Sequence, residues 1–393
     1  MNNKEYLNIL AGLATLKNLY KSNVSYEELL IVKSFLLLLR NKGLLIKRNF
    51  DLKTEDCKLF IQESVDDCDN QNIKDLYYSN LKTTINSVRK PYLNSLYDVY
   101  LNISESFIDN HGQDFFDNEI QNVIKSKGQI QMDVLQPKGL TDLINHFCDY
   151  TSVKDYYNPF AGLASLALNL PKHINYCGEE FNEKIWLLGK LRLLIYNCPK
   201  TFNYKNCNSF KNWELSTKQK YDFIGFNPPL NLRLSESDLD NLNSDYAYKN
   251  NANSLIISKC FDQLKDNGKM ALVMSSAFLF SSHPRDKQLK KELVDNGYIE
   301  RIIALPDRLF NFTSIAVNLI ILNKKSNSNK KIEFIDASEK YKKDDGKINI
   351  LDEVEIYRLL SENHDKSKSL VSFEEVSKNN YNLSVNRYIF EDL

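Results

Sequence analysis

The chain has 393 residues, enough for two or three domains with a large hydrophobic core. It carries 51 Lys and Arg against 51 Asp and Glu, and this zero net charge excludes the strongly basic chromatin-type proteins. No two of its 12 glycines are two or five positions apart, which excludes the GxGxxG fingerprint and the Walker A loop. The five histidines and seven cysteines form no HExxH, zinc-finger or CxxC pattern, so no metal site is expected.

Cysteines without clustered spacing are typical of buried thiols in a reducing compartment. The longest uncharged run lies between Asp155 and Lys172 and is too short and too interrupted to span a bilayer. The amino-terminal MNNKEYLNIL also lacks the layout of a signal peptide. We therefore expect a cytoplasmic protein with no membrane contact.

The apolar pattern divides the chain into three parts. In residues 1–127, apolar side chains recur at spacings of three and four, which predicts a helical amino-terminal domain. In residues 128–336, short apolar runs alternate with helical patterns, which predicts a doubly wound α/β domain with a parallel sheet. Residues 337–393 are predicted to form a carboxy-terminal helical extension, with a helix near Asp352 to Glu362.

Within the α/β domain the apolar runs predict individual elements. A strand over Val317 to Asn323 follows the preceding strand too closely for a crossover helix, so it should pair antiparallel at the sheet edge. The other predicted strands are Val153 to Asn158, Ile174 to Gly178, Asp222 to Phe226, Met270 to Ser275 and Ile299 to Leu305. The predicted helices are Leu163 to Leu170, Glu183 to Tyr196, Asn253 to Asp266 and Arg285 to Asp295.

The first candidate site is the segment Asn158-Pro-Phe-Ala-Gly162-Leu-Ala-Ser165, which follows a predicted strand. Ligands of open α/β sheets bind at such strand ends, and glycine permits close approach of the backbone. Glu180 ends the next strand, 18 residues after Gly162, where a carboxylate can accept hydrogen bonds from ribose hydroxyls. Alone, the first segment is an ordinary turn and Glu180 a surface carboxylate; together they suggest a cofactor with a nucleoside.

The second and stronger candidate is Asn227-Pro228-Pro229-Leu230, after an apolar strand. An exocyclic aromatic amine is a poor nucleophile, and two acceptors aimed at its two hydrogens would hold the nitrogen in tetrahedral geometry. The Asn227 side-chain oxygen and the Pro228 carbonyl can supply these acceptors, while proline keeps the loop stiff. Such a site works by preorganised electrostatics. The competing interpretation is that the prolines only end the strand.

The order and content of these motifs resemble the N6-adenine DNA methyltransferases, and most closely the modification subunits of type I restriction-modification systems. NPFAGLAS resembles the cofactor loop of the family, GEEF its Gly-x-Glu, and FNPPL its catalytic Asn-Pro-Pro-aromatic. The block KMALVMSSAFLF, the block IERIIALPDRLFNFTSIAVNLIILNKK and the tail ending NRYI also resemble the family, so the likeness covers nearly the whole chain.

The resemblance implies a fold: a seven-stranded, Rossmann-like methyltransferase sheet after an all-helical amino-terminal domain. It also implies S-adenosylmethionine as cofactor, and catalysis by Asn227 and Pro228 with Pro229 and Leu230 walling a flipped adenine. The cofactor-binding residues that it implies are Gln136, Pro137, Asn158, Phe160, Gly162, Glu180 and Asn208. The implied partners are double-stranded DNA, a separate specificity subunit, since no paired target-recognition segment is present, and a restriction subunit.

Four positions depart from the family pattern. Asn158 and Asn208 stand where the family often has Asp, and Ala164 where it often has Gly. Leu230 replaces an aromatic residue, and either Phe310 or Phe312 could supply a ring unless both belong to the core. We therefore expect N6-adenine methylation of DNA, with two alternatives left open: a degenerate methyltransferase fold that serves as a DNA-binding or scaffold subunit, and a protein or RNA methyltransferase.

Overall fold

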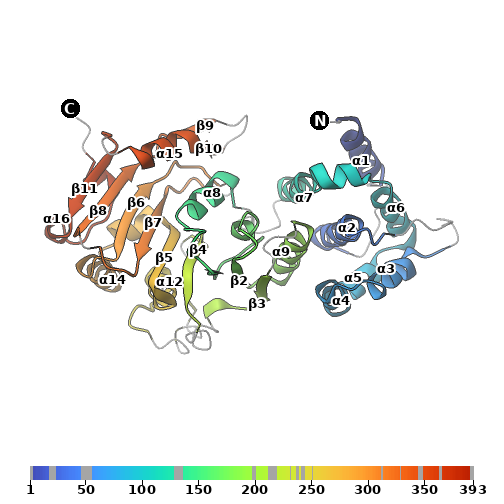
Figure 1. Cartoon of the computed structure of the whole chain (residues 1–393), viewed down its shortest axis with the longest axis horizontal. Coiled ribbons are helices and arrows are strands. Elements are labelled where there is room, and N and C mark those ends of the chain that lie inside the picture. The colour runs from blue at the N-terminus through green and yellow to red at the C-terminus, as the bar shows by residue number, and fades with distance from the viewer. Residues whose placement is uncertain are drawn as a thin grey trace. The chain divides into compact units, whose positions relative to one another are not determined.

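In the computed structural model the chain forms two compact units (Figure 1). The first unit consists of residues 1–131 and 187–197, and the second consists of residues 132–186 and 198–393. The residues described by the structure are 3–16, 24–45, 55–127, 136–196, 201–210, 219–230, 232–235, 239, 244–249, 251–310, 313–327, 329–343, 348–362 and 365–389.

The first unit is helical, as the sequence predicts, and is drawn mostly in blue to teal in Figure 1. Its second helix begins with a capping box, in which Ser25 Oγ accepts from the Glu28 amide (3.2 Å) and Glu28 Oε2 accepts from the Ser25 amide (2.7 Å). Its helices are α1 (Asn3–Thr15), α2 (Tyr26–Asn41), α3 (Cys57–Asp66), α4 (Gln71–Leu76), the π-helical turn η2 (Tyr77–Leu81), α5 (Lys82–Ser87), α6 (Lys90–Leu101) and α7 (Glu105–Lys127).

Most of helix α9 (Glu183–Tyr196) also belongs to the first unit. Arg192 is 4% exposed, and its Nε lies 2.8 Å from Asp117 Oδ1 on α7. The Tyr196 hydroxyl donates to Asp117 Oδ2 at 2.9 Å. This charge-assisted pair holds α9 against α7, because removing Asp117 would take away the carboxylate that neutralises the buried Arg192 guanidinium.

The second unit is built on a nine-stranded sheet with the order β11-β8-β6-β7-β5-β4-β1-β2-β3. Strand β7 is antiparallel to both neighbours and β11 is antiparallel to β8, while the other pairs are parallel. The strands are β1 (Asp155–Asn158), β2 (Asn175–Glu180), β3 (Thr201–Asn206), β4 (Tyr221–Phe226), β5 (Leu264–Ser275), β6 (Ile299–Ala304), β7 (Val317–Asn323), β8 (Lys331–Asp336) and β11 (Lys368–Ser372).

Seven of these strands, in the order β3-β2-β1-β4-β5-β7-β6, form the doubly wound sheet that the sequence predicts, and β8 and β11 extend it. The chain order reverses between β1 and β4, so this is the switch point where ligands of such sheets bind. The antiparallel pairing of β7 is confirmed, but its predicted place at the sheet edge is wrong. Strand β7 lies between β5 and β6, where its nearly continuous apolar sequence is buried.

Helices cover both faces of the sheet. Tyr157 belongs to the core that α12 (Asn253–Asp262) and α14 (Pro284–Asp295) complete. The adjacent Tyr156 points to the other face, because side chains alternate along a strand, and its hydroxyl donates to Asn145 of α8 (Lys138–His146) at 2.8 Å. The helices α13 (Ser276–Phe280) and α16 (Phe373–Lys378) and the 3₁₀ turn η5 (Val385–Arg387) complete the second unit.

The sequence prediction differs from the structure at three further places. The helix predicted over Asn253 to Asp266 ends at Asp262, and Leu264 begins β5. A helix over Leu163 to Leu170 is wrong: only the 3₁₀ turn η4 (Ser165–Ala167) forms, since Gly162 and Ala164 have left-handed φ values of 52° and 57°. Strand β3 was not predicted, because its sequence TFNYKN is polar and mostly exposed at the sheet edge.

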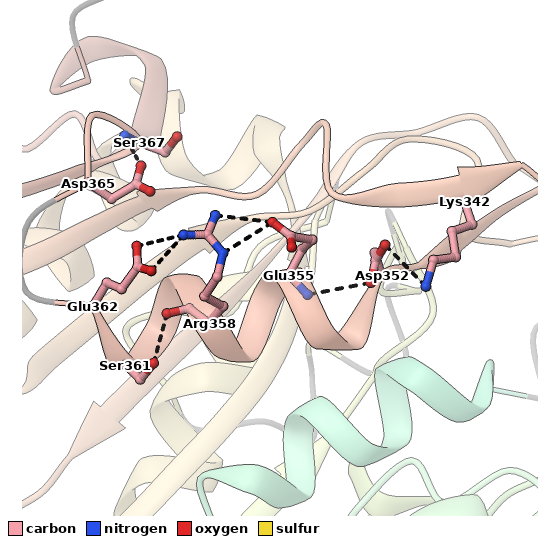
Figure 2. Close-up of polar contacts among 8 residues, drawn as sticks. All are labelled: Lys342, Asp352, Glu355, Arg358, Ser361, Glu362, Asp365 and Ser367. Carbon is pink, nitrogen blue, oxygen red and sulfur yellow. Dashed lines mark hydrogen bonds and ion pairs between the residues drawn. The ribbon is translucent and has the colours of Figure 1, made fainter.

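The segment after residue 336 is not purely helical. It contains α15 (Glu353–Ser361) and a small antiparallel sheet of β9 (Tyr341–Lys343) and β10 (Asn349–Leu351), in addition to β11 of the main sheet. Figure 2 shows Arg358 of α15 between Glu355 and Glu362, at 3.1 and 2.7 Å. Such exposed helix pairs contribute only about 0.3–0.5 kcal/mol each, so the apolar face of α15, rather than its charges, fixes the helix.

Candidate active site

The loop after β1 is closed by its own side chains. Asn158 is 2% exposed, and its Oδ1 accepts from the Phe160 amide at 3.1 Å. The Ala161 amide donates to the Glu179 carbonyl at 2.8 Å, which ties the loop to the neighbouring strand β2. The left-handed φ of Gly162 then turns the chain back, a conformation that glycine adopts without a steric penalty.

Glu180 ends β2 and joins two loops through its carboxylate. Its Oε2 accepts from the Gly162 amide at 3.1 Å, and its Oε1 accepts from the Asn182 amide at 2.7 Å. Burial raises the pKa of this carboxyl, and the backbone hydrogen bonds oppose that rise. A carboxylate has about four acceptor positions, so the half-buried Glu180 keeps capacity for further donors.

The end of β3 completes this part of the site. Asn208 Oδ1 accepts from the Phe210 amide at 3.0 Å, and Ser209 Oγ donates to the Pro159 carbonyl at 2.6 Å. The Tyr204 hydroxyl donates to the Gly162 carbonyl. The loops after β1, β2 and β3 are thus connected directly. They bring together, at the carboxyl ends of these strands, Asn158, Phe160, Gly162, Glu180 and Asn208.

The Asn-Pro-Pro segment follows β4, the strand beside β1 on the other side of the switch point. Asn227 Oδ1 is buried, and no described residue donates a hydrogen bond to it. Pro228 is buried, Pro229 is exposed and Leu230 is half-buried. A buried acceptor without a donor costs about 1–3 kcal/mol, and this oxygen is therefore available for a donor from outside the described residues.

The predicted pair Gln136 and Pro137 lies at the start of α8. The Gln136 side-chain Nε2 donates to Thr141 Oγ1 at 3.0 Å, and the Thr141 backbone amide donates to the Pro137 carbonyl at 3.0 Å. These described bonds stay within the first turn of α8 and do not reach the loops after β1 and β2. Of the two candidate rings, Phe310 is buried at 5% exposure, whereas Phe312 lies outside the described residues.

Sequence reasoning missed three residues at the carboxyl ends of the strands. Phe181 follows Glu180 directly and is 75% exposed, an unusual position for a large aromatic side chain. Ser275 ends β5 beside the Asn-Pro-Pro segment, and its hydroxyl, like Asn227 Oδ1, is buried without a partner among the described residues. Ser209 holds the β1 loop. Only Phe181 has a sequence signal, an aromatic residue immediately after the acidic residue at a strand end.

Comparison with known proteins identifies the family. The model of the N-6 DNA methylase family matches residues 113–392. The chain belongs to the N-6 DNA methylase family. The family and the fold are those of S-adenosylmethionine-dependent methyltransferases. The predicted resemblance to this family and the predicted fold class are therefore confirmed.

Among curated relatives, the type I restriction enzyme MpnII methylase subunit of Mycoplasma pneumoniae is 25% identical over 300 residues, covering 68% of this chain and 54% of that protein. The HindI methylase subunit of Haemophilus influenzae is 25% identical over 290 residues, covering 67% of this chain and 65% of that protein. The chain thus spans between about half and two thirds of the length of these two members of the type I methylase group.

Solved structures share the fold. The methyltransferase subunit of a type I restriction-modification system from Streptococcus thermophilus has a TM-score of 0.69 at 22% identity, covering 96% of this chain and 83% of that chain. A chain from a study of complex assembly in a type I restriction-modification system has a TM-score of 0.71 at 14% identity, covering 100% and 93%. Within the described part of the chain, no helix is long and apolar enough to cross a membrane.

Proposed function

We propose that this N-6 DNA methylase family member methylates N6 of a flipped adenine in double-stranded DNA, as the methylase subunit of a restriction-modification system. The observation that carries the proposal is the unpaired, buried Asn227 Oδ1 beside Pro228 at the end of β4. Two acceptors on the exocyclic amine would favour its nucleophilic geometry. The type I relatives support a specificity subunit and a restriction subunit as partners.

The residues at the ends of β1, β2 and β3 fit S-adenosylmethionine, which supplies the methyl group when bound. Glu180 keeps acceptor capacity for ribose hydroxyls, and Gly162, which has no side chain, permits close approach. Phe181 offers an exposed ring for the adenine of the cofactor. Asn208 Oδ1 already accepts one hydrogen bond, from the Phe210 amide of its own loop. The side-chain amide of Asn208 can still contact the adenine of the cofactor, but it contributes no charge.

The substrate class can be tested directly. The chain is tagged, purified from its own host with the subunits that accompany it, and incubated with labelled S-adenosylmethionine and duplex DNA, RNA or host protein. We expect label in DNA alone, released on digestion as N6-methyldeoxyadenosine. Label in RNA or protein alone would assign the chain to the other methyltransferase class, and cofactor binding without transfer to any of the three would favour the scaffold alternative.

The Glu180 carboxyl should give cofactor binding a characteristic pH dependence. Because burial raises its pKa, Glu180 takes up a proton at a higher pH than an ordinary glutamate, and a protonated carboxyl loses acceptor capacity. We expect the affinity for S-adenosylmethionine, measured by calorimetry, to fall as the pH is lowered through this raised pKa. Glu180→Gln, which cannot ionise, should flatten the profile; an unchanged profile would mean that another group titrates.

Leu230→Phe should improve engagement of the target base. Base–aromatic stacking contributes about 1–3 kcal/mol per base, and leucine provides only part of this contact. We expect the KM for DNA to fall several-fold, with little change in the affinity for S-adenosylmethionine. Leu230→Met, of similar size but without a ring, is the matched control. Equal KM values for the two variants would show that residue 230 does not face the base.

A further inference from the structure

The helix α14 carries a buried carboxylate that is separate from the candidate cofactor and catalytic residues. Asp286, in the first turn of α14, is 2% exposed and accepts hydrogen bonds from three hydroxyls. The donors are the hydroxyls of Tyr248 (2.9 Å), Ser254 (2.5 Å) and Ser281 (2.6 Å). A carboxylate of this kind is a fixed anchor, because hydrogen bonds to a charged, buried acceptor are short and strong.

The surroundings of Asp286 are also fixed. The Tyr248 ring stacks on the His283 imidazole, with 3.9 Å between ring centroids and 10° between planes. Lys290, 1% exposed and one helical turn after Asp286, donates to the carbonyls of Leu279 and Ser281 at 2.9 and 2.8 Å. Burial lowers the pKa of Lys290 to about 8, and the nearby Asp286 carboxylate opposes this shift.

Two of the hydroxyls that Asp286 holds flank Ala252 in the sequence. Tyr248 precedes Ala252 by four residues, and Ser254 follows it by two. Ala252 is fully buried, and its amide donates to the Leu232 carbonyl at 2.9 Å. This bond joins the segment that leaves β4 to the segment that enters α12, and we call the pair Leu232 and Ala252 the neck.

The neck restricts the Asn-Pro-Pro segment, because only a few residues separate the end of β4 from Leu232. Phe226 is fixed in β4 and Leu232 in the neck, so only residues 227–231 lie between two fixed points. These residues include Asn227, the two prolines and Leu230. With φ of both prolines restricted, the placement of the second fixed point determines how Pro229 and Leu230 lie.

We propose that Asp286 is a positioning residue, which holds the Leu232–Ala252 neck through Tyr248 and Ser254 and thereby orients the segment that engages the target adenine. This inference rests on the proposed function of Asn227. Displacement of a reacting group by about 1 Å can cost about 100-fold in rate, so loosening the neck should lower turnover. The candidate cofactor residues are on β1, β2 and β3, and cofactor affinity should not change.

The test compares two substitutions of the same kind. Tyr248→Phe removes the bond to Asp286, whereas Tyr246→Phe removes an exposed bond from the same segment to Glu292 on the same helix. We expect Tyr248→Phe to lower kcat for DNA methylation about 10-fold, because the segment that engages the target base is displaced from its productive position, with the Kd for S-adenosylmethionine unchanged. Tyr246→Phe should stay within about two-fold of the original kcat, because its exposed bond contributes little.

A second readout does not depend on activity. Amide hydrogen exchange of Ala252 reports opening of its bond to Leu232, and we expect it to accelerate about 10-fold in Tyr248→Phe and not in Tyr246→Phe. Unchanged Ala252 exchange in Tyr248→Phe would overturn the inference even if the proposed methylation were absent. An equal loss of kcat and cofactor affinity would also overturn it, since that pattern indicates general loosening of the fold. Asp286→Asn should lower kcat less in the Tyr248→Phe background than in the original chain, because the two residues act through the same hydrogen bond.

Discussion

Asn227→Ala is expected to lower the rate of DNA methylation by about 100-fold or more while leaving the affinity for S-adenosylmethionine nearly unchanged. The side-chain oxygen of Asn227 is buried without a partner among the described residues, so its removal costs the folded protein little. Its contribution is realised only when the amine of a target base arrives. Single-turnover methylation gives the rate, and calorimetry gives the cofactor affinity.

Asn227→Asp is the matched control for this loss. It keeps an acceptor oxygen at the same position and should retain much more activity than Asn227→Ala. Weakened cofactor binding in Asn227→Ala, with an unchanged rate at saturating cofactor, would move Asn227 from the catalytic step to the cofactor site and contradict our assignment.

Glu180→Ala is expected to weaken binding of S-adenosylmethionine by about 100-fold or more, since two hydrogen bonds to a charged acceptor contribute about 1.5–3 kcal/mol each. The substitution also leaves the amides of Gly162 and Asn182 without their acceptor, so the loops that form the site become less ordered. Calorimetry on the purified chain measures the affinity, and thermal unfolding measures the structural part of the loss.

Glu183→Ala serves as the control, because Glu183 is exposed in the first turn of α9, three residues after Glu180. It should bind the cofactor like the original chain. Glu180→Gln keeps one acceptor oxygen, and its affinity for S-adenosylmethionine should lie between that of Glu180→Ala and that of the original protein. Equal affinities for Glu180→Ala and Glu183→Ala, both folded, would show that the carboxylate at the end of β2 does not hold the ribose.

Apolar runs and spacing predict the parts of this fold that are locally encoded. Helix α9 has the predicted bounds, Glu183 to Tyr196, since its apolar residues and the flanking polar residues define it. Strands β1, β2, β4, β5 and β6 each overlap a predicted strand, because their central residues are buried and mostly apolar or aromatic. Strand β3 carries a polar edge sequence, and hydrogen bonding to β2 overrides its weak local preference.

The details of the site depend on contacts that the sequence does not show. A left-handed Ala164 shortens the predicted helix after Gly162, and this backbone conformation is rare for alanine. Glu180 and the Asn-Pro-Pro segment are visible as motifs, but the unpaired oxygen of Asn227 requires coordinates. Tyr248 and Asp286 are 38 residues apart, and neither belongs to a motif, so only the fold brings them together.

Sequencing of modified bases in the genome of the host tests the central claim most directly. The gene is deleted and then restored as the original chain or as Asn227→Ala, and N6-methyladenine is mapped in each strain. We expect methylation of one recognition sequence to disappear on deletion, to return with the original chain and to stay absent with Asn227→Ala. Identical methylation maps in the parent strain, the deletion strain and the two restored strains would contradict the proposed function. Restoration by Asn227→Ala would contradict the catalytic role of Asn227.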